Sequence, residues 1–156
     1  MIDTPFTRSF GLKHAIALAP EPGLAAGGLA AAVADAGGLG LIGCGSEDAE
    51  WIAAEFAKTG ETAVGCGLSC SALEEDPARL EAAIEGRPRA AYMYDGDPRS
   101  HAKTLHSARV RIICEVRDLD DAKRAAEAGA HVIVARGTDA AGQPGPHTLF
   151  SLVPEL

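Results

Sequence analysis

Short apolar runs alternate with alanine-rich segments along the chain, and this alternation restricts the fold more than any other feature. Six such runs begin about 23 residues apart, which is the spacing of repeated strand–helix units. The runs are apolar on both faces, as strands are in a parallel sheet that helices cover. The strands predicted from them are 15–19, 39–43, 63–68, 90–94, 110–116 and 131–135.

Four of the intervening segments have the composition of helices, and the clearest of them lies between the last two predicted strands. Asp118 can cap its beginning, and Gly129 can end it. The segments "ADAGGLGLIG" (34–43) and "AEAGAHVIVA" (126–135) then repeat one pattern of helix end, glycine and buried strand. The predicted helices are 23–36, 47–58, 73–85 and 118–129.

The predicted fold is a single α/β domain over residues 1–156, with a parallel sheet of about six βα units. A closed (β/α) barrel needs eight strands and about 250 residues, and this chain has 156. Two architectures therefore remain open at this point, an open doubly wound sheet and an incomplete TIM-type barrel.

Charge and hydropathy exclude several classes of function. The formal net charge is −8, whereas a nucleic-acid surface needs clustered Lys and Arg. No apolar run is long enough to span a membrane, and the first residues lack the apolar core of a signal peptide. We therefore expect a cytoplasmic protein that acts on a small molecule, without nucleic acid or membrane as a partner.

The four cysteines predict buried thiols and no metal. Cys44, Cys66 and Cys114 lie in or beside apolar runs, where a thiol behaves as a small hydrophobic group. Cys66 and Cys70 could form half of a zinc site, but no second closely spaced pair of ligands follows them.

Glycine motifs point to the ends of the strands. Residues 38–43 fit the pattern G-x-G-x-x-G, but they follow a helix and lie within a strand, which is the wrong context for a dinucleotide site. Small residues also gather after several strands, where parallel folds bind ligands. Such clusters fit either a ligand-binding rim or simple βα turns. They are 19–23, 43–45, 67–69, 115–117 and 136–139.

Long phrases of the sequence resemble the nitronate monooxygenases, also called 2-nitropropane dioxygenases. The phrases are "TPFTRSFGLKHAIALAP", "GGLAAAVADAGGLGLIGCG", "IICEVRDLDDAKRAAEAGAHVIVARGTDAAG" and "LFSLVPEL". They follow one another in the same order as in the family and extend from Thr4 to Leu156. The resemblance implies an FMN-dependent TIM-barrel flavoprotein that oxidises alkyl nitronates with O2 to a carbonyl compound and nitrite.

The resemblance also implies where the flavin would lie. Ala19, Pro20 and Glu21 take the place of the family's A-P-M turn over the flavin ring. Gly67 stands where the family usually has asparagine, and Glu115 where it often has Gln or Lys. Two carboxylates beside the ring would oppose its reduction unless they are protonated or paired. A possible partner is Arg136, which replaces the family's common Gln.

The loop after the last predicted strand resembles the family signature G-T-E-A-G-G-H-x-G. Gly137, Thr138 and Gly142 keep its pattern, whereas Gln143 replaces its histidine. Glutamine can orient a nitro group by hydrogen bonds but cannot exchange a proton. His147, four residues further on, could serve as a substitute base. Gln143 and His147 are thus the candidate catalytic residues.

The family continues beyond Leu156 with two further strands, which carry its grip on the FMN phosphate. We therefore expect a short form, in which the phosphate-binding half of the site is absent from this chain. Open sheet edges expose apolar surface, so we expect a homo-oligomer or another chain to cover them. The alternative function is a non-catalytic relative that serves as an oligomerising or small-ligand-binding module.

Overall fold

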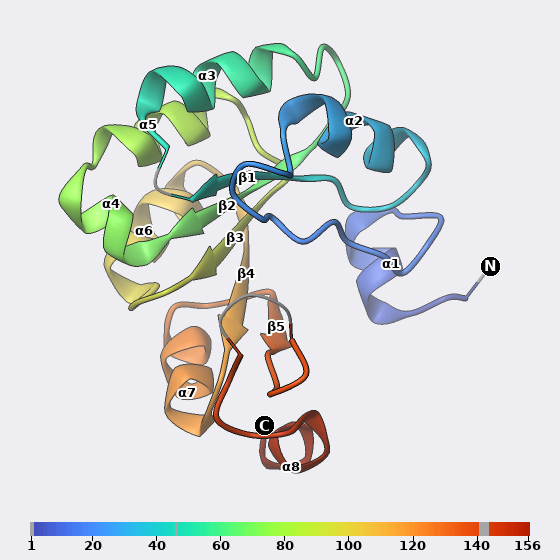
Figure 1. Ribbon diagram of the computed structural model, residues 1–156, viewed down its shortest axis with the longest axis vertical. Helices are drawn as coiled ribbons and strands as arrows, with labels where there is room; N and C mark the ends of the chain where they lie inside the picture. The colour runs from blue at the N-terminus through green and yellow to red at the C-terminus, as the bar shows by residue number, and fades with distance from the viewer. Residues whose placement is uncertain (1, 46, 141–143) are drawn as a thin grey trace.

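The computed structural model contains one sheet of five parallel strands. It describes residues 2–45, 47–140 and 144–156. The strands pair in the order in which they follow one another along the chain (Figure 1). A doubly wound sheet reverses its strand order at one point. This sheet does not, which favours the incomplete barrel over the doubly wound sheet. The strands are β1 (Leu41–Gly45), β2 (Gly65–Ser69), β3 (Ala90–Tyr94), β4 (Arg111–Val116) and β5 (Val132–Ala135).

The predicted strand over 15–19 is wrong. This segment makes a single parallel bridge, between Ala17 and Leu39. The Leu18 N–H donates to the Leu39 carbonyl oxygen at 2.9 Å, and the Leu39 N–H donates to Ile16 at 2.9 Å. The ladder ends there because Pro20 has no N–H to donate. The other five predicted strands are confirmed, with ends that shift by up to two residues.

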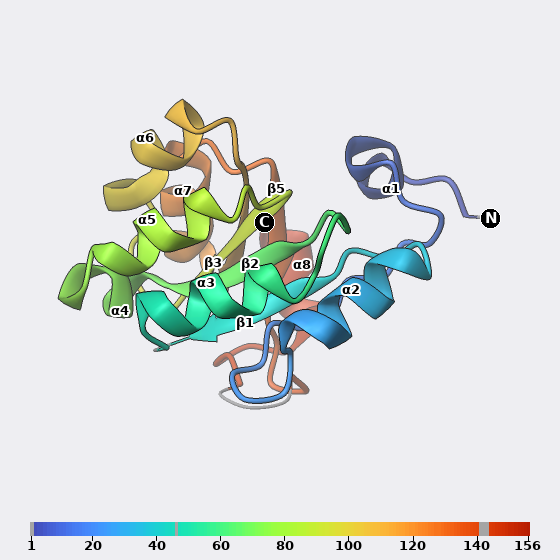
Figure 2. The ribbon, with the colours of Figure 1, turned by 90° about the horizontal axis from the view of Figure 1, so that it is seen from above.

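Most helices pack along one side of the curved sheet, opposite the side on which α1 lies (Figures 1 and 2). The predicted helices 23–36, 47–58 and 118–129 are confirmed in shortened form. The predicted helix 73–85 is split, because Asp76 precedes Pro77 and adopts an extended conformation. The helices on this side are α2 (Gly27–Asp35), α3 (Ala49–Ala57), α4 (Cys70–Glu75), α5 (Ala78–Glu85), α6 (Arg99–Ser107) and α7 (Leu119–Glu127).

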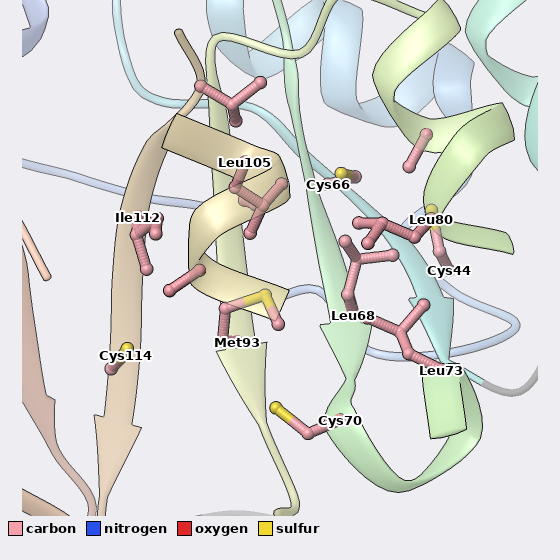
Figure 3. Close-up of a cluster of buried hydrophobic side chains, with 14 of the residues drawn as sticks. Cys44, Cys66, Leu68, Cys70, Leu73, Leu80, Met93, Leu105, Ile112 and Cys114 are labelled. Carbon is pink, nitrogen blue, oxygen red and sulfur yellow. The ribbon is translucent and has the colours of Figure 1, made fainter. Parts of the chain in front are cut away.

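The main core lies between the sheet and these helices (Figure 3). Its four cysteines are buried and free. Burial was predicted for Cys44, Cys66 and Cys114, and Cys70 joins them. Burial raises the pKa of Cys70 to about 12, and burial raises the pKa of Cys114 to about 12. These thiols therefore stay protonated near neutral pH and pack as apolar groups.

A smaller core closes the amino ends of the strands on the other side of the sheet. Helix α1 (Pro5–Phe10) is capped by Thr4 and buries Phe10 there. The Arg111 guanidinium lies 5.1 Å from the centre of the Phe10 ring, and Arg89 donates to the Phe10 carbonyl oxygen. This end of the partial barrel is filled by the chain's own side chains, which leaves the carboxyl end as the place for a ligand.

The chain ends in a short helix, α8 (Leu149–Glu155), which follows the loop after β5. Leu152 is its fully buried residue, whereas Phe150 is exposed. In the part of the chain that the structure describes, no helix has the length and apolarity needed to cross a membrane.

Candidate functional site

A pocket of about 470 Å³ opens at the carboxyl ends of β3, β4 and β5. Its walls are the turn at 19–22, the ends of these three strands with Asp95 and Arg117, the residues Arg136, Gly137, Asp139 and Ala140 after β5, and Leu149 of α8. The carboxyl ends of the strands are where TIM-type barrels bind ligands. The volume lies within the range of small-molecule sites.

The turn at 19–22 forms one wall, and glycines make room for it. A Cβ on Gly67 would overlap the Pro20 ring, and a Cβ on Gly43 would lie 2.6 Å from the Glu21 carbonyl oxygen. Gly67 is therefore covered by Pro20 and does not line the pocket. At these two positions the small residues admit a turn of the chain itself.

Three polar side chains from neighbouring strands meet on the floor of the pocket. The Tyr92 hydroxyl donates to Glu115 Oε2 at 2.9 Å. Arg136 Nη1 donates to both carboxylate oxygens of Glu115 at 2.9 Å. The side chains of Arg136 and Glu115 are only 19% and 12% exposed, so water screens this pair weakly. We refer to these three residues as the polar floor.

The polar floor fixes the protonation of its tyrosine. Burial, followed by the Glu115 carboxylate, raises the pKa of Tyr92 well above its ordinary value. Tyr92 therefore remains a hydrogen-bond donor at neutral pH. The expected partnership between Arg136 and Glu115 is present, so Glu115 does not bring an uncompensated charge to the pocket.

A second tyrosine and a carboxylate line the pocket beside the polar floor. The rings of Tyr92 and Tyr94 lie 6.3 Å apart and are tilted by 52°. Burial, followed by the neighbouring Cys44 and Asp95, raises the pKa of Tyr94 to about 12. Asp95 accepts hydrogen bonds from Ser69 and Ser71, which lower the pKa of its carboxyl group.

Tyr92, Tyr94 and Asp95 line the pocket but were not predicted as site residues. The signal was available in part, because alternate residues of a strand point to one face. Tyr92 and Tyr94 are two residues apart at the end of a predicted strand, and Asp95 follows directly.

The loop after β5 contributes some of its expected residues to the pocket. Gly137 lines the pocket, as do Asp139 and Ala140. Thr138 and His147 are exposed and do not line it. The Thr138 N–H donates to the His147 carbonyl oxygen at 2.9 Å, which ties the two ends of the loop together.

The remaining predicted positions divide into two groups. Gly142 and Gln143 lie outside the described residues. The structure brings the others together at the pocket, and these are Ala19, Pro20, Glu21, Glu115, Arg136 and Gly137.

The pocket has the features that a flat heteroaromatic ring requires. Small residues from two segments, Ala19 and Ala135, allow close approach to the backbone, and the tyrosines add aromatic surface. The polar floor offers a donor and an acceptor. The residues present thus fit the ring of a flavin. Among the described residues, no three His, Cys, Asp or Glu side chains are grouped so that they could hold a metal ion.

The sequence is similar to curated nitronate monooxygenases, although no protein-family profile matches it. It is 25% identical to the enzyme of Pseudomonas aeruginosa over 90% of this chain and 52% of that protein. It is 28% identical to the enzyme of Paraburkholderia phytofirmans over 86% of this chain and 48% of that protein. It is 29% identical to the enzyme of Neurospora crassa over 88% of this chain and 47% of that protein. The chain thus spans about half the length of these relatives.

Solved structures share the fold. FabK from Thermotoga maritima matches 98% of this chain and 50% of its own, with a TM-score of 0.90 and 24% identity. Nitroalkane oxidase from Streptomyces ansochromogenes matches 92% of this chain and 55% of its own, with a TM-score of 0.77 and 20% identity. The five parallel strands are thus part of a barrel of this type. The chain is thus similar in sequence to nitronate monooxygenases and in fold to FabK and nitroalkane oxidase.

Proposed function

We propose that this chain carries part of the active site of an FMN-dependent oxidoreductase of the nitronate monooxygenase type. The reaction would be the oxidation of alkyl nitronates with O2 to a carbonyl compound and nitrite. The observation that supports this most is the pocket at the carboxyl ends of β3–β5, which six of the residues expected to bind flavin line. The names of the relatives, monooxygenase and oxidase, point to the same class of chemistry.

Residues of the pocket would hold the flavin ring. Ala19, Pro20 and Glu21 would lie against one side of it, and Gly137 would allow close approach on another. When bound, FMN supplies the redox chemistry that amino-acid side chains lack. By pairing with Glu115, Arg136 would reduce the negative potential where the ring would lie.

The substrate would contact the loop after β5. Gln143 would orient the nitro group by hydrogen bonds, although it lies outside the described residues. His147 is the titratable side chain proposed to assist it. In the structure His147 is exposed and does not line the pocket.

A flavin titration combined with a nitrite assay tests this proposal. We expect saturable FMN binding, measured as a shift of the flavin absorbance bands. With an alkyl nitronate as substrate, we also expect nitrite release and O2 uptake. Arg136→Met should weaken FMN binding by about tenfold, because it leaves the Glu115 carboxylate uncompensated beside the ring. Arg99→Met, which removes an arginine outside this pocket, is the control. Absence of saturable FMN binding by the unchanged chain would remove the proposal.

A second candidate function is a non-catalytic module that binds a small ligand or another polypeptide. The observation that favours it is an apolar surface at the β5 edge, where Phe150 is 96% exposed and Ile133 is 40% exposed. We call this surface, with Val153, the β5–α8 face. Exposed apolar surface of this kind is typical of an interface, and we propose that a second copy of the chain or another polypeptide covers it.

A further inference from the structure

Asp95 differs from the other non-glycine residues whose backbone has a positive φ. Within the described residues these are Arg87, Asp95 and Arg109, with φ of 52°, 54° and 59°. Arg87 and Arg109 each follow a helix, after α5 and α6, where a left-handed residue commonly ends the helix. Asp95 instead follows strand β3 and lines the pocket. Strained residues of this kind are concentrated at binding sites.

The carboxylate of Asp95 is held in one place. The hydroxyl groups of Ser69 and Ser71 lie 3.0 Å and 2.5 Å from its Oδ2. The Ser71 N–H also donates to the Asp95 carbonyl oxygen at 3.0 Å. The hydrogen bonds from Ser71 and Ser69 stabilise the ionised carboxylate and so lower the pKa of Asp95. The other carboxylate oxygen, Oδ1, accepts no hydrogen bond from the described residues, so it can accept one from a ligand.

The charges around the pocket reinforce this role. Both arginines that line it already face carboxylates. Arg136 pairs with Glu115. Arg117 lies 3.6 Å from Asp121, and its charge also helps to lower the pKa of Asp95. The remaining carboxylates of the lining belong to Glu21, Asp95 and Asp139. Four carboxylates thus face two arginines in the lining. This excess of negative charge opposes a second anion near Asp95 and favours a hydroxyl or ammonium group.

We propose that Asp95 is a specificity-determining residue of the pocket, which selects ligands that present a hydroxyl or ammonium group and rejects those that present a carboxylate. This inference rests on the proposed function, since it names the class of nitro compound that the site takes. Substrates would be nitroalkanes or nitronates that carry a remote hydrogen-bond donor. Asp95 acts through Oδ1 as a fixed acceptor for that group.

Ligand-observed NMR titration of the protein with two matched probes tests the inference. The probes are 2-nitroethanol, which carries a hydroxyl group, and 3-nitropropionate, which carries a carboxylate. We expect 2-nitroethanol to bind at least about fivefold more tightly than 3-nitropropionate. In Asp95→Asn the ratio should fall to about one, because the amide accepts and donates equally well.

The variants are chosen so that loss of fold does not obscure the result. Asparagine and glycine both tolerate a positive φ, so Asp95→Asn and Asp95→Gly should keep the melting temperature and should both lose selectivity. The matched control is Asp97→Asn, which changes a carboxylate two residues away that pairs with Arg99 and does not line the pocket. It should keep the selectivity of the unchanged chain.

The outcomes separate this inference from the proposed function. Equal affinity for the two probes, tighter binding of 3-nitropropionate, or binding of neither probe would overturn the role of Asp95. An unchanged ratio in Asp95→Asn would also overturn it. FMN titration and nitrite release are measured on the same samples. Selectivity without FMN binding removes the proposed function alone, and an active flavoprotein without selectivity removes this inference alone.

Discussion

The two edges of the sheet, β1 and β5, differ in how far the chain covers them. Both strands are terminal in the strand order. All five residues of β1 are buried, whereas none of the four described residues of β5 is. The segment before β1, which makes the Ala17–Leu39 bridge, and the turn at 19–22 lie against the β1 side. An edge strand thus becomes part of the core when an earlier segment of the same chain covers it.

The comparison also explains where the pocket lies. It opens beside β5, and the turn that covers the end of β1 reaches far enough to form its opposite wall. The less buried edge therefore carries the candidate site. Sites of low local stability are commonly the functional ones, because they must admit a ligand.

The largest expected effect compares matching isoleucines on the two edge strands. Ile42 of β1 is 0% exposed, and Ile133 of β5 is 40% exposed. Ile42→Ala should lower the free energy of unfolding by about 2–5 kcal/mol. Ile133→Ala should lower it by less than about 1.5 kcal/mol, because less apolar surface is buried there. Urea denaturation followed by circular dichroism measures both values, and equal losses would show that the two edges do not differ.

The next effect tests whether the turn at 19–22 is packed tightly onto the sheet. Gly67→Ala should lower the free energy of unfolding by about 1–3 kcal/mol, because the new methyl group overlaps Pro20. Gly28 lies in α2 with open space around it. Gly28→Ala should therefore raise stability by about 0.5–1 kcal/mol. A neutral Gly67→Ala substitution would mean that the turn moves freely.

A third prediction concerns the β5–α8 face. If a second copy covers this face, Phe150→Ser combined with Val153→Ser should weaken self-association by about tenfold or more. Sedimentation velocity over a range of concentrations measures this. Leu24→Ser is the matched control, because Leu24 is 72% exposed but precedes β1. If the unchanged chain is monomeric at all concentrations, the prediction that a second copy covers the β5–α8 face is wrong. A different polypeptide would then be the remaining candidate for this face.

The smallest effect is a pH dependence at the amino end of β5. His131 Nδ1 accepts a hydrogen bond from the Ile112 N–H at 3.1 Å. Burial, followed by the nearby His106 and Arg111, lowers the pKa of His131 from its ordinary value of 6.5. Its contribution to stability is therefore complete above pH 6.5 and is lost as the pH falls toward the lowered pKa.

The substitution His131→Gln tests this contribution, because glutamine can accept the same hydrogen bond without titrating. The loss of stability between pH 6.5 and pH 5 should become smaller in this variant than in the unchanged chain. His14→Gln, at an exposed position before the sheet, is the control. An equal pH slope in all three proteins would contradict the assignment.

Much of the fold could be predicted from the sequence, because its strands and helices follow local patterns. Helix α7 begins after Asp118 and ends before Gly129, as its capping residues indicate. The errors came from prolines. Pro20 ends the pairing of 15–19 after one bridge, and Pro77 divides the helix predicted over 73–85. Proline effects are local, so a stricter reading of these two positions would have corrected both predictions.

The polar floor could not be predicted from local patterns alone. Tyr92 and Glu115 lie on β3 and β4, and Arg136 directly follows β5, so their contacts depend on the register in which these strands pair. A shift of one residue would turn each side chain to the other face. The family resemblance indicated the positions of Glu115 and Arg136. It did not indicate that Tyr92 joins them.

The four buried cysteines give this protein internal reporters of its own motions. Cys44, Cys66 and Cys114 lie on three strands beneath the helices, and Cys70 begins α4. A buried thiol reacts with a labelling reagent only while its surroundings are open. The rate of labelling at each cysteine would therefore report how often each helix separates from the sheet, without the introduction of any probe.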